Sequence, residues 1–398
     1  MPTAQAGPSP RTPVPSAAYD AIVVGLGAMG SATAYHLARR GRRVLGLEAF
    51  PHGHTFGSSH GESRIIRLAY FEHPNYVPLL RRAYTLWEAL QREAGTELLR
   101  LTGGLFVGPP AGALVSGSLR TARVHDLPHQ VLDSAEVRRR FPALRPGPAD
   151  AALYEAQAGV LFPERCIEAH LRLAAAAGAE LRQEEPVRRW AATAGGVAVE
   201  TDVGRYSAGW LVLTAGAWLG GLLADLRLPL QPERIPTFWM EPRESPKLFD
   251  AGRFPVWIWE ASELGFFYGC PHLDWAGAKV GRHHSGEPCD PATVDRQVRP
   301  RDEARVRQFL ARCMPALDGP IAGSRVCLYT NTPDEHFVVD RHPDFPSVLF
   351  AGGFSGHGFK FAPVVGEILA DLVTEGAATP AADFLRVDRF AVPRPSRA

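Results

Sequence analysis

The chain has few of the residues that mark a metal-binding, disulfide-stabilised or membrane-spanning protein. Its 398 residues include only five cysteines, scattered without the paired spacing of a zinc site or of a disulfide framework. No apolar run approaches the length needed to cross a bilayer. The 43 basic and 42 acidic residues nearly balance, so no excess charge points to nucleic acid or to a charged membrane surface. We therefore expect no metal, mostly reduced thiols and a cytoplasmic protein.

Residues 1–17 lack the apolar core of a signal peptide and are rich in Pro, Ala, Ser and Thr. This composition is typical of a disordered tail, which we expect here. The rest of the chain is long enough for two domains of ordinary size.

The stretch Tyr19–Glu48 has the pattern of a nucleotide-binding βαβ unit. The apolar run Ala21–Val24 is typical of a buried parallel strand, and Ser31–Arg40 has helical composition. A second apolar run, Arg43–Leu47, follows the helix. The order strand, helix, strand predicts a Rossmann-like fold in a mixed α/β protein.

The turn before that helix has the spacing G-x-G-x-x-G. The first glycine allows the turn, the second lets a pyrophosphate approach the backbone, and the third lets the helix pack on the strand. An acid at the end of the second strand stands where this fold holds a pair of ribose hydroxyls. The residues predicted to bind a dinucleotide are Gly25, Gly27, Ala28, Met29, Gly30 and Glu48.

Several later segments have helical or strand patterns. Tyr76–Glu93 has an apolar stripe at helical spacing, whereas Leu101–Pro148 reads as short strands and turns with one helical piece. Trp210–Trp218 is typical of a buried strand that ends in small residues and, in flavoproteins of this class, returns to the first sheet. Further expected elements are a helical piece at 134–140, a strand at 159–162, a helix at 166–177, strands at 179–190 and 197–201, strands at 254–260 and 265–269, and helices at 301–314 and 363–374.

Three segments resemble one family. Gly57–Arg67, Cys327–Glu335 and Gly353–Lys360 are similar to segments of the monomeric sarcosine oxidase family of FAD-dependent amine oxidases, which includes N-methyltryptophan oxidase and L-pipecolate oxidase. The likeness extends over Tyr19–Phe390, and the first two segments most resemble the pipecolate oxidase branch. The resemblance implies a monomer that oxidises a small secondary amino acid with dioxygen, and FAD joined covalently through the thioether of the matching cysteine, Cys327.

The order and composition of the segments also predict a domain arrangement. We expect a discontinuous Rossmann-like FAD-binding domain made of residues 18–88, 150–225 and 325–391. A mixed-sheet substrate domain, residues 89–149 and 226–324, is then inserted between its pieces. The amino-acid composition changes after Pro229, where Trp, Phe, Pro and His become frequent, and this change supports a second domain.

Roles for individual residues follow from the same resemblance. Arg64 and Lys360 match the two residues that bind the substrate carboxylate in this family, and Lys279 matches the lysine that activates dioxygen. The remaining matches line the substrate pocket or contact the flavin. The pocket set is His60, Arg67, His283 and Tyr268, and the flavin set is Val187, Ala215, Gly216, Gly353, Gly356 and Gly358.

Residue types alone leave alternatives open. Arg64 and Arg67 would share one face of a helical turn, and such a pair is also typical of a solvated basic turn. A buried structural thiol is the alternative role for Cys327, and a lysine on a strand edge is the alternative for Lys279. His60 and His283 suit ordinary packing roles, and spacing barely separates His283 from its neighbour His284.

One position departs from the family. Trp259 stands where sarcosine oxidases tend to carry a flexible Met, and Trp257 is close by. We expect these indoles to narrow the cavity or to stack on a ring-shaped substrate.

The expected function is an FAD-dependent oxidase that converts a secondary α-amino acid to an imine and dioxygen to hydrogen peroxide. Two alternatives stay open at this point. A flavin dehydrogenase would pass its electrons to another acceptor, and a flavin-carrying subunit would have no turnover. A nicotinamide dehydrogenase is disfavoured by the flavin-like C-terminal block.

Overall fold

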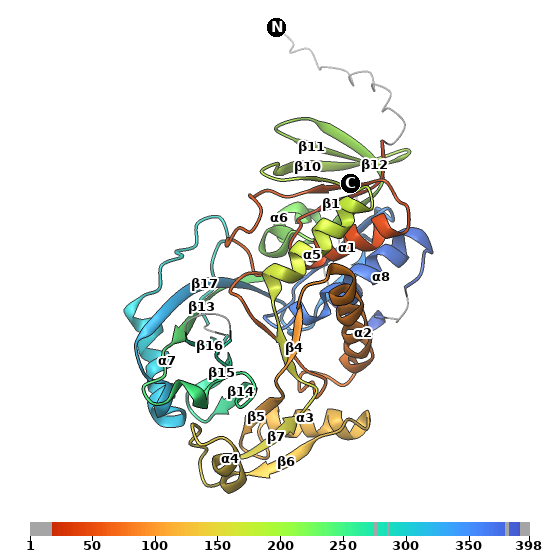
Figure 1. Ribbon diagram of the computed structural model, residues 1–398. Coiled ribbons are helices and arrows are strands. Elements are labelled where there is room, and N and C mark those ends of the chain that lie inside the picture. Colours follow the sequence, from red (N-terminus) through yellow and green to blue (C-terminus); the bar gives the residue numbers. More distant parts are fainter. Residues whose placement is uncertain (1–17, 274–276, 285, 379–381, 391–398) are drawn as a thin grey trace.

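A computed structural model describes residues 18–273, 277–284, 286–378 and 382–390, so the predicted tail lies outside the described residues. Two large mixed sheets form the two halves of the molecule (Figure 1). Helices α1, α2, α5 and α8 gather beside the first sheet, and α7 lies on the second. A small sheet joins β3 (Arg64–Ile66), β8 (Gly159–Leu161) and β4 (Leu99–Leu101).

The first sheet is built around β1 (Tyr19–Val24), which pairs in parallel with β2 (Val44–Leu47) and with β12 (Arg205–Leu213). Ala21 and Val23 pack on the side of the helices, while Ile22 and Val24 pack on the opposite side. A strand buried on both faces explains the unbroken apolar run. The other strands are β9 (Glu180–Arg182), β10 (Val187–Thr193), β11 (Gly196–Thr201), β18 (Val338–Arg341) and β19 (Val348–Gly352).

These pairings confirm the predicted Rossmann-like sheet, including the return of the strand near Trp210 to β1. Strand β19 arrives from the far end of the chain and pairs with β12 in parallel. The helices of this half are α1 (Ala28–Arg39), α2 (Tyr76–Ala94), α5 (Pro163–Ala176), α6 (Leu219–Leu222) and α8 (Ala362–Thr374).

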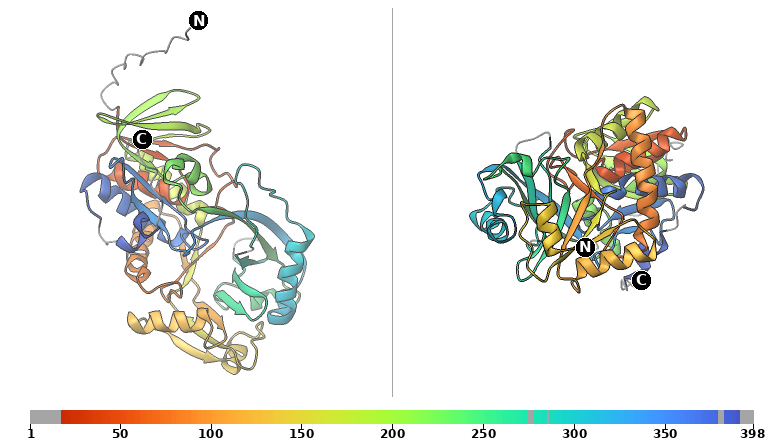
Figure 2. Two further views of the ribbon diagram at one scale, coloured as in Figure 1. Left: turned by 180° about the vertical axis from the view of Figure 1, so that it is seen from behind. Right: turned by 60° about the horizontal axis from the view of Figure 1, so that its bottom comes forward.

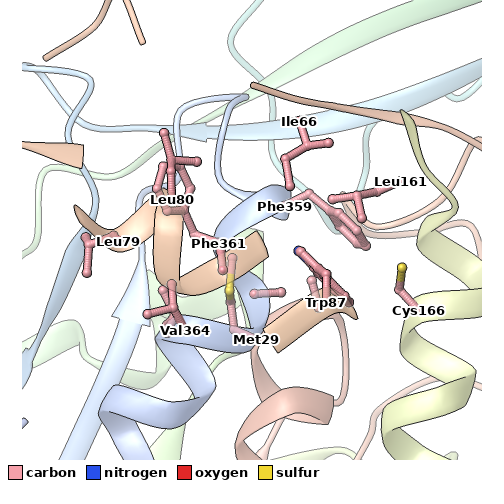
Figure 3. Packing of buried hydrophobic residues seen from close by; sticks show 14 of the residues in the cluster. Met29, Ile66, Leu79, Leu80, Trp87, Leu161, Cys166, Phe359, Phe361 and Val364 are labelled. Atoms are coloured by element: carbon pink, nitrogen blue, oxygen red, sulfur yellow. The ribbon is translucent and has the colours of Figure 1, made fainter. Parts of the chain in front are cut away.

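Helix α2 shows why its sequence folds as it does. Its predicted apolar stripe is buried at Leu79, Ala83, Trp87 and Leu90, against α8 and the short turn Phe359–Phe361. Figure 3 shows this packing, with side chains of α2 facing those of the C-terminal segment. Burial of this face stabilises the helix more than its intrinsic propensity does.

The second sheet has the order β17-β13-β16-β15-β14-β5-β7-β6. In Figure 2 it curves away from the first sheet, with α7 on its outer side. Its strands are β5 (Gly104–Gly108), β6 (Gln130–Asp133), β7 (Ala151–Glu155), β13 (Gln231–Met240), β14 (Val256–Ala261), β15 (Gly265–Cys270), β16 (Ala278–His283) and β17 (Ile321–Asn331). Its helices are α3 (Ala113–Val124), α4 (Ser134–Arg140) and α7 (Pro300–Cys313).

Two local expectations are wrong. Arg64 lies in strand β3, where pairing with β8 overrides the expected helical turn, so Arg64 and Arg67 share no helical face. Helix α3 stands inside the stretch read as strands and turns. Its Ser, Gly and Thr residues are poor helix formers, and packing on β5 and β7 stabilises it instead.

The predicted domain boundary at residue 325 falls within β17, which pairs along its length with β13 of the second sheet. Strand β7 likewise belongs to the second sheet although it begins just after residue 150. The division into two domains therefore stays a prediction, with these strands passing between its parts.

Two searches of the described residues bear on the class of protein. No described helix is both long enough and apolar enough to cross a membrane. No group of three or more His, Cys, Asp or Glu side chains in that part of the chain is placed to hold a metal ion.

Candidate active site

A cavity of about 780 Å³ lies between the two sheets. This volume is typical of a cofactor or ligand site. The first sheet contributes the carboxyl ends of its strands, where open α/β sheets bind nucleotides. The second sheet contributes residues of β13 to β17. The cavity is lined by every predicted site residue except Gly30, which packs beneath it: Gly25, Gly27, Ala28, Met29, Glu48, His60, Arg64, Arg67, Val187, Ala215, Gly216, Tyr268, Lys279, His283, Cys327, Gly353, Gly356, Gly358 and Lys360.

At one end of the cavity, helix α1 begins without a side-chain cap at Gly27 and without an acid in its first turn. Its positive end is therefore suited to an anion such as a pyrophosphate. Glu48 is fixed beside it, because Oε2 accepts a hydrogen bond from the backbone N–H of Leu26 at 2.8 Å. Gly30 lies under the turn, where a Cβ atom would collide with the carbonyl oxygen of Gly25. The third glycine thus serves close packing, as expected.

Arg64 borders the sulfur of Cys327, and both Arg64 and Lys279 lie beside Gly61 in the cavity. Nη2 of Arg64 donates hydrogen bonds to the carbonyl oxygens of Ser58 (2.7 Å) and His60 (2.6 Å), and lies 3.6 Å from Sγ of Cys327. Lys279 is 2% exposed, and its Nζ donates to the carbonyl oxygen of Gly61 at 2.7 Å. Burial, and then the charge of Arg64, lower the pKa of Lys279 to about 8.

A second pair of cations lies at another part of the cavity. Nη2 of Arg67 donates to both carboxylate oxygens of Glu72, at 2.6 and 2.7 Å. Nζ of Lys360 donates to the carbonyl oxygen of His357 at 2.6 Å. Burial, and then the charge of Arg67, lower the pKa of Lys360 to about 7. Burial opposes the charge on Glu72, but Arg67 outweighs it and lowers the pKa of that carboxyl to about 2.

Arg67 and Lys360 share a neighbour, since both cationic groups stand over the ring of Tyr70. The structure therefore places Arg67 beside Lys360 and places Arg64 beside Cys327. The sequence-based pairing of Arg64 with Lys360 does not match this arrangement.

The predicted pocket histidines are neutral. Burial, and then the charges of Arg64 and Lys279, lower the pKa of His60 to about 3. Both ring nitrogens of His60 lack a partner within the described chain. Nδ1 of His283 lies 3.2 Å from the hydroxyl of Tyr329, and burial lowers the pKa of His283 well below its usual value. Tyr268 stands edge-on to His283, with ring centroids 6.4 Å apart.

The expectation that two indoles narrow the cavity is wrong. Successive side chains of strand β14 point to opposite faces of the sheet, so Trp257 and Trp259 share one face. Both pack on Phe309 in the core of the second sheet. Ile258, between them, points to the other face and lines the cavity. The same alternation was readable in the sequence and would have identified Ile258.

The loop after β19 brings backbone against the cavity. Gly356 has φ of 78°, and a Cβ atom there would collide with the ring of Tyr329. Tyr329, Glu72 and Cys270 also line the cavity but were missed in the sequence. Cys270 is paired across the sheet with Lys279, which only the register of β15 and β16 shows.

Comparison with known proteins agrees with this geometry. Residues 20–372 match the family described as FAD dependent oxidoreductase. The chain belongs to this family. It is 50% identical over 364 residues to monomeric sarcosine oxidase of Streptomyces avermitilis, covering 91% of this chain and 95% of that protein. It is 35% identical to N-methyl-L-tryptophan oxidase of Salmonella arizonae, with coverage of 94% and 99%.

A solved structure supports the fold. NikD, described as an unusual amino acid oxidase essential for nikkomycin biosynthesis, superposes with a TM-score of 0.83 at 27% identity. The match covers 92% of this chain and 97% of that one. The predicted resemblance to the sarcosine oxidase group and the predicted fold class are therefore confirmed.

The residues present suit FAD, the cofactor of this family. Helix α1 and Glu48 offer a positive end for phosphates and an acceptor for ribose hydroxyls. In the same cavity, the buried ring nitrogens of His60 and the buried hydroxyl of Thr330 have no hydrogen-bond partner among the described residues. Unpaired buried polar atoms of this kind are explained by a polar ligand.

Proposed function

We propose that this chain is an FAD-dependent oxidase of secondary α-amino acids, with sarcosine or a cyclic relative as substrate and hydrogen peroxide as a product. The observation that carries the proposal is a buried pair of cations, Arg67 and Lys360, in the same cavity as the dinucleotide end and Lys279. A zwitterionic amino acid needs such a pair for its carboxylate.

The carboxylate is assigned to Arg67 and Lys360. Nη2 of Arg67 already donates to both carboxylate oxygens of Glu72, so this guanidinium is placed to bind a carboxylate. The donors of Arg64 are directed at backbone carbonyls and at Cys327, which suits a role beside the cofactor. This revises the sequence-based assignment, in which Arg64 was the carboxylate partner.

The dinucleotide would be held by α1, Glu48, Val187, Ala215 and Gly216, and its ring by Cys327 and the loop of Gly353, Gly356 and Gly358. When bound, FAD supplies the two-electron acceptor for oxidation of the C–N bond and is reoxidised by dioxygen. The chain's own residues orient the substrate. With His60 and His283 neutral, the site adds no imidazolium charge next to the substrate amine.

Lys279 is assigned to dioxygen. Its ammonium is held by the carbonyl oxygens of Gly61 and Ser63, and it stands 5.4 Å from the centroid of the Trp239 ring. A fixed cation in a buried site stabilises negative charge that develops on dioxygen.

A substrate panel tests the proposed function. Sarcosine, L-pipecolate, L-proline and N-methyl-L-tryptophan are each supplied to the purified protein in air, and peroxide is measured. We expect peroxide from at least one. Substrate-dependent reduction of an artificial electron acceptor without peroxide would favour the dehydrogenase, and no turnover with any acceptor would favour a non-catalytic flavin carrier.

The first prediction concerns the pH dependence of carboxylate binding. Lys360, with its pKa of about 7, is protonated below that pH and loses its charge as pH rises through it. Acetate, which has a carboxylate and no amine, should therefore bind about tenfold more weakly at pH 9 than at pH 6. The Kd of acetate, followed through the flavin absorbance, checks this. In Lys360→Met the change in the Kd of acetate near pH 7 should vanish, whereas in Lys279→Met it should persist. If the Kd of acetate in Lys360→Met depends on pH as in the wild type, Lys360 is not the carboxylate partner.

The second prediction concerns substrate size. Ile258 lines the cavity, so Ile258→Ala should raise the ratio of kcat/KM for N-methyl-L-tryptophan to that for sarcosine by about tenfold. Trp259→Phe is the matched control, because Trp259 points into the core and should leave the ratio unchanged. A changed ratio in Trp259→Phe, with an unchanged ratio in Ile258→Ala, would mean that Trp259 and not Ile258 faces the substrate.

A further inference from the structure

Tyr70 is buried behind the cavity and does not line it. Its ring is nevertheless shared by the two cations assigned to the carboxylate. The Cζ atom of Arg67 stands 4.2 Å from the ring centroid, and Nζ of Lys360 stands 5.1 Å from it. Tyr70 is 0% exposed, Arg67 2% and Lys360 5%, so water does not screen these contacts.

We propose that Tyr70 is a positioning residue of the carboxylate site, whose aromatic ring holds Arg67 and Lys360 together against their mutual repulsion. The proposal rests on the proposed function, which assigns the substrate carboxylate to these two cations. The carboxylate of Glu72 pairs with Arg67 and also attracts Lys360, but Arg67 has the larger influence on Lys360, so the two cations still repel in a site where little solvent separates them. The negative face of one aromatic ring attracts both, and attraction to aromatic rings is largest where the cation has lost its water.

The ring is fixed in place by its hydroxyl. The hydroxyl of Tyr70 is hydrogen-bonded to Nδ1 of His357, while Nε2 of the same imidazole lies 2.9 Å from the carbonyl oxygen of Glu335. Burial lowers the pKa of His357 to about 3, although the charge of Glu72 opposes this, so the imidazole is neutral. A neutral imidazole that donates from Nε2 accepts at Nδ1, so the Tyr70 hydroxyl is the donor.

The same segment anchors Lys360, because its Nζ donates to the carbonyl oxygen of His357. His357 therefore orients the ring through its side chain and one of the two cations through its backbone. Thr121 adds a further constraint, since its hydroxyl donates to the carbonyl oxygen of Tyr70 at 2.8 Å. The ring and both cations form one connected unit.

The test compares acetate with its neutral isostere acetamide on the holoenzyme, with binding followed through the flavin absorbance. In Tyr70→Leu the Kd of acetate should rise about tenfold, and that of acetamide should stay within about twofold. The contacts of Arg67 with Phe71 and Phe106 remain in this variant and limit the loss. With the preferred substrate, KM should rise much more than kcat falls.

Tyr70→Phe keeps the ring and should retain most of the affinity for acetate. Tyr76→Leu is the matched control, because Tyr76 packs on Tyr70 in the same aromatic cluster while its hydroxyl faces His336. Neither Arg67 nor Lys360 stands over the Tyr76 ring. Tyr76→Leu should therefore leave the preference for acetate over acetamide intact.

If Tyr70→Leu does not fold, phenylalanines with one, two and three ring fluorines at position 70 replace it. The Kd of acetate should then rise with each fluorine, because fluorine withdraws electron density from the ring face. An affinity independent of fluorination, or an equal loss for acetate and acetamide, would overturn the proposal. Failure of the proposed function is distinguishable, since the wild type would then prefer acetate yet oxidise no secondary amino acid.

Discussion

Replacement of Cys327 by serine should leave FAD free to separate from the denatured polypeptide. The thiolate of a cysteine is the nucleophile able to form a thioether with the flavin, and a serine hydroxyl is far less reactive. Cys327 is 6% exposed, lines the cavity and has the guanidinium of Arg64 at 3.6 Å. Acid precipitation checks this. The yellow colour should stay in the pellet of the wild type and pass entirely to the supernatant of Cys327→Ser.

Cys270→Ser is a matched control. Cys270 is also buried and lines the same cavity, but burial raises the pKa of its thiol and so disfavours the reactive thiolate. In this variant the colour should remain with the pellet. Colour released from the wild type, or retained by Cys327→Ser, would refute the covalent link while leaving FAD itself in place.

Removal of the charge at Lys279 should slow reoxidation by dioxygen about 10² to 10³-fold, which is the range for loss of one buried electrostatic contact to developing charge. The substitution is Lys279→Met, which keeps the length of the side chain. Reduction by substrate should change much less, because we assign the substrate carboxylate to Arg67 and Lys360 and not to Lys279. Stopped-flow absorbance of the flavin measures the two half-reactions separately.

Lys247→Met is the control for this experiment, because Lys247 is exposed and lies outside the cavity lining. Both half-reactions should be unchanged in it. Equal slowing of reduction and reoxidation in Lys279→Met would show that the lysine supports the site as a whole, and the assignment to dioxygen would then fail.

The nucleotide-binding half of the molecule could be predicted because its signals are local. The strand near Ala21, the glycine turn and the stripe of α2 are each contained in one short segment. Helix α3 was not predicted, because Ser116, Gly117 and Thr121 are poor helix formers. Only packing on the second sheet makes this segment helical.

The candidate site was predicted as a set of residues but not as an arrangement. Motifs named Arg64, Arg67 and Lys360, yet which arginine lies beside Lys360 depends on how the segment after β3 turns towards Tyr70. Similarly, the indoles of Trp257 and Trp259 were noted as residues, but the pleat of β14 directs both away from the cavity. Such contacts join residues far apart in the chain, and no local pattern encodes them.

The central claim is that a secondary amino acid reduces the flavin and that dioxygen then reoxidises it. The most direct measurement mixes the purified protein with sarcosine, and separately with L-pipecolate, without oxygen while the flavin absorbance is recorded, and then admits air. The account predicts that at least one of them bleaches the flavin, and that its colour returns in air with about one peroxide per flavin. A flavin that stays oxidised with both, or that is bleached but returns no peroxide in air, would contradict it.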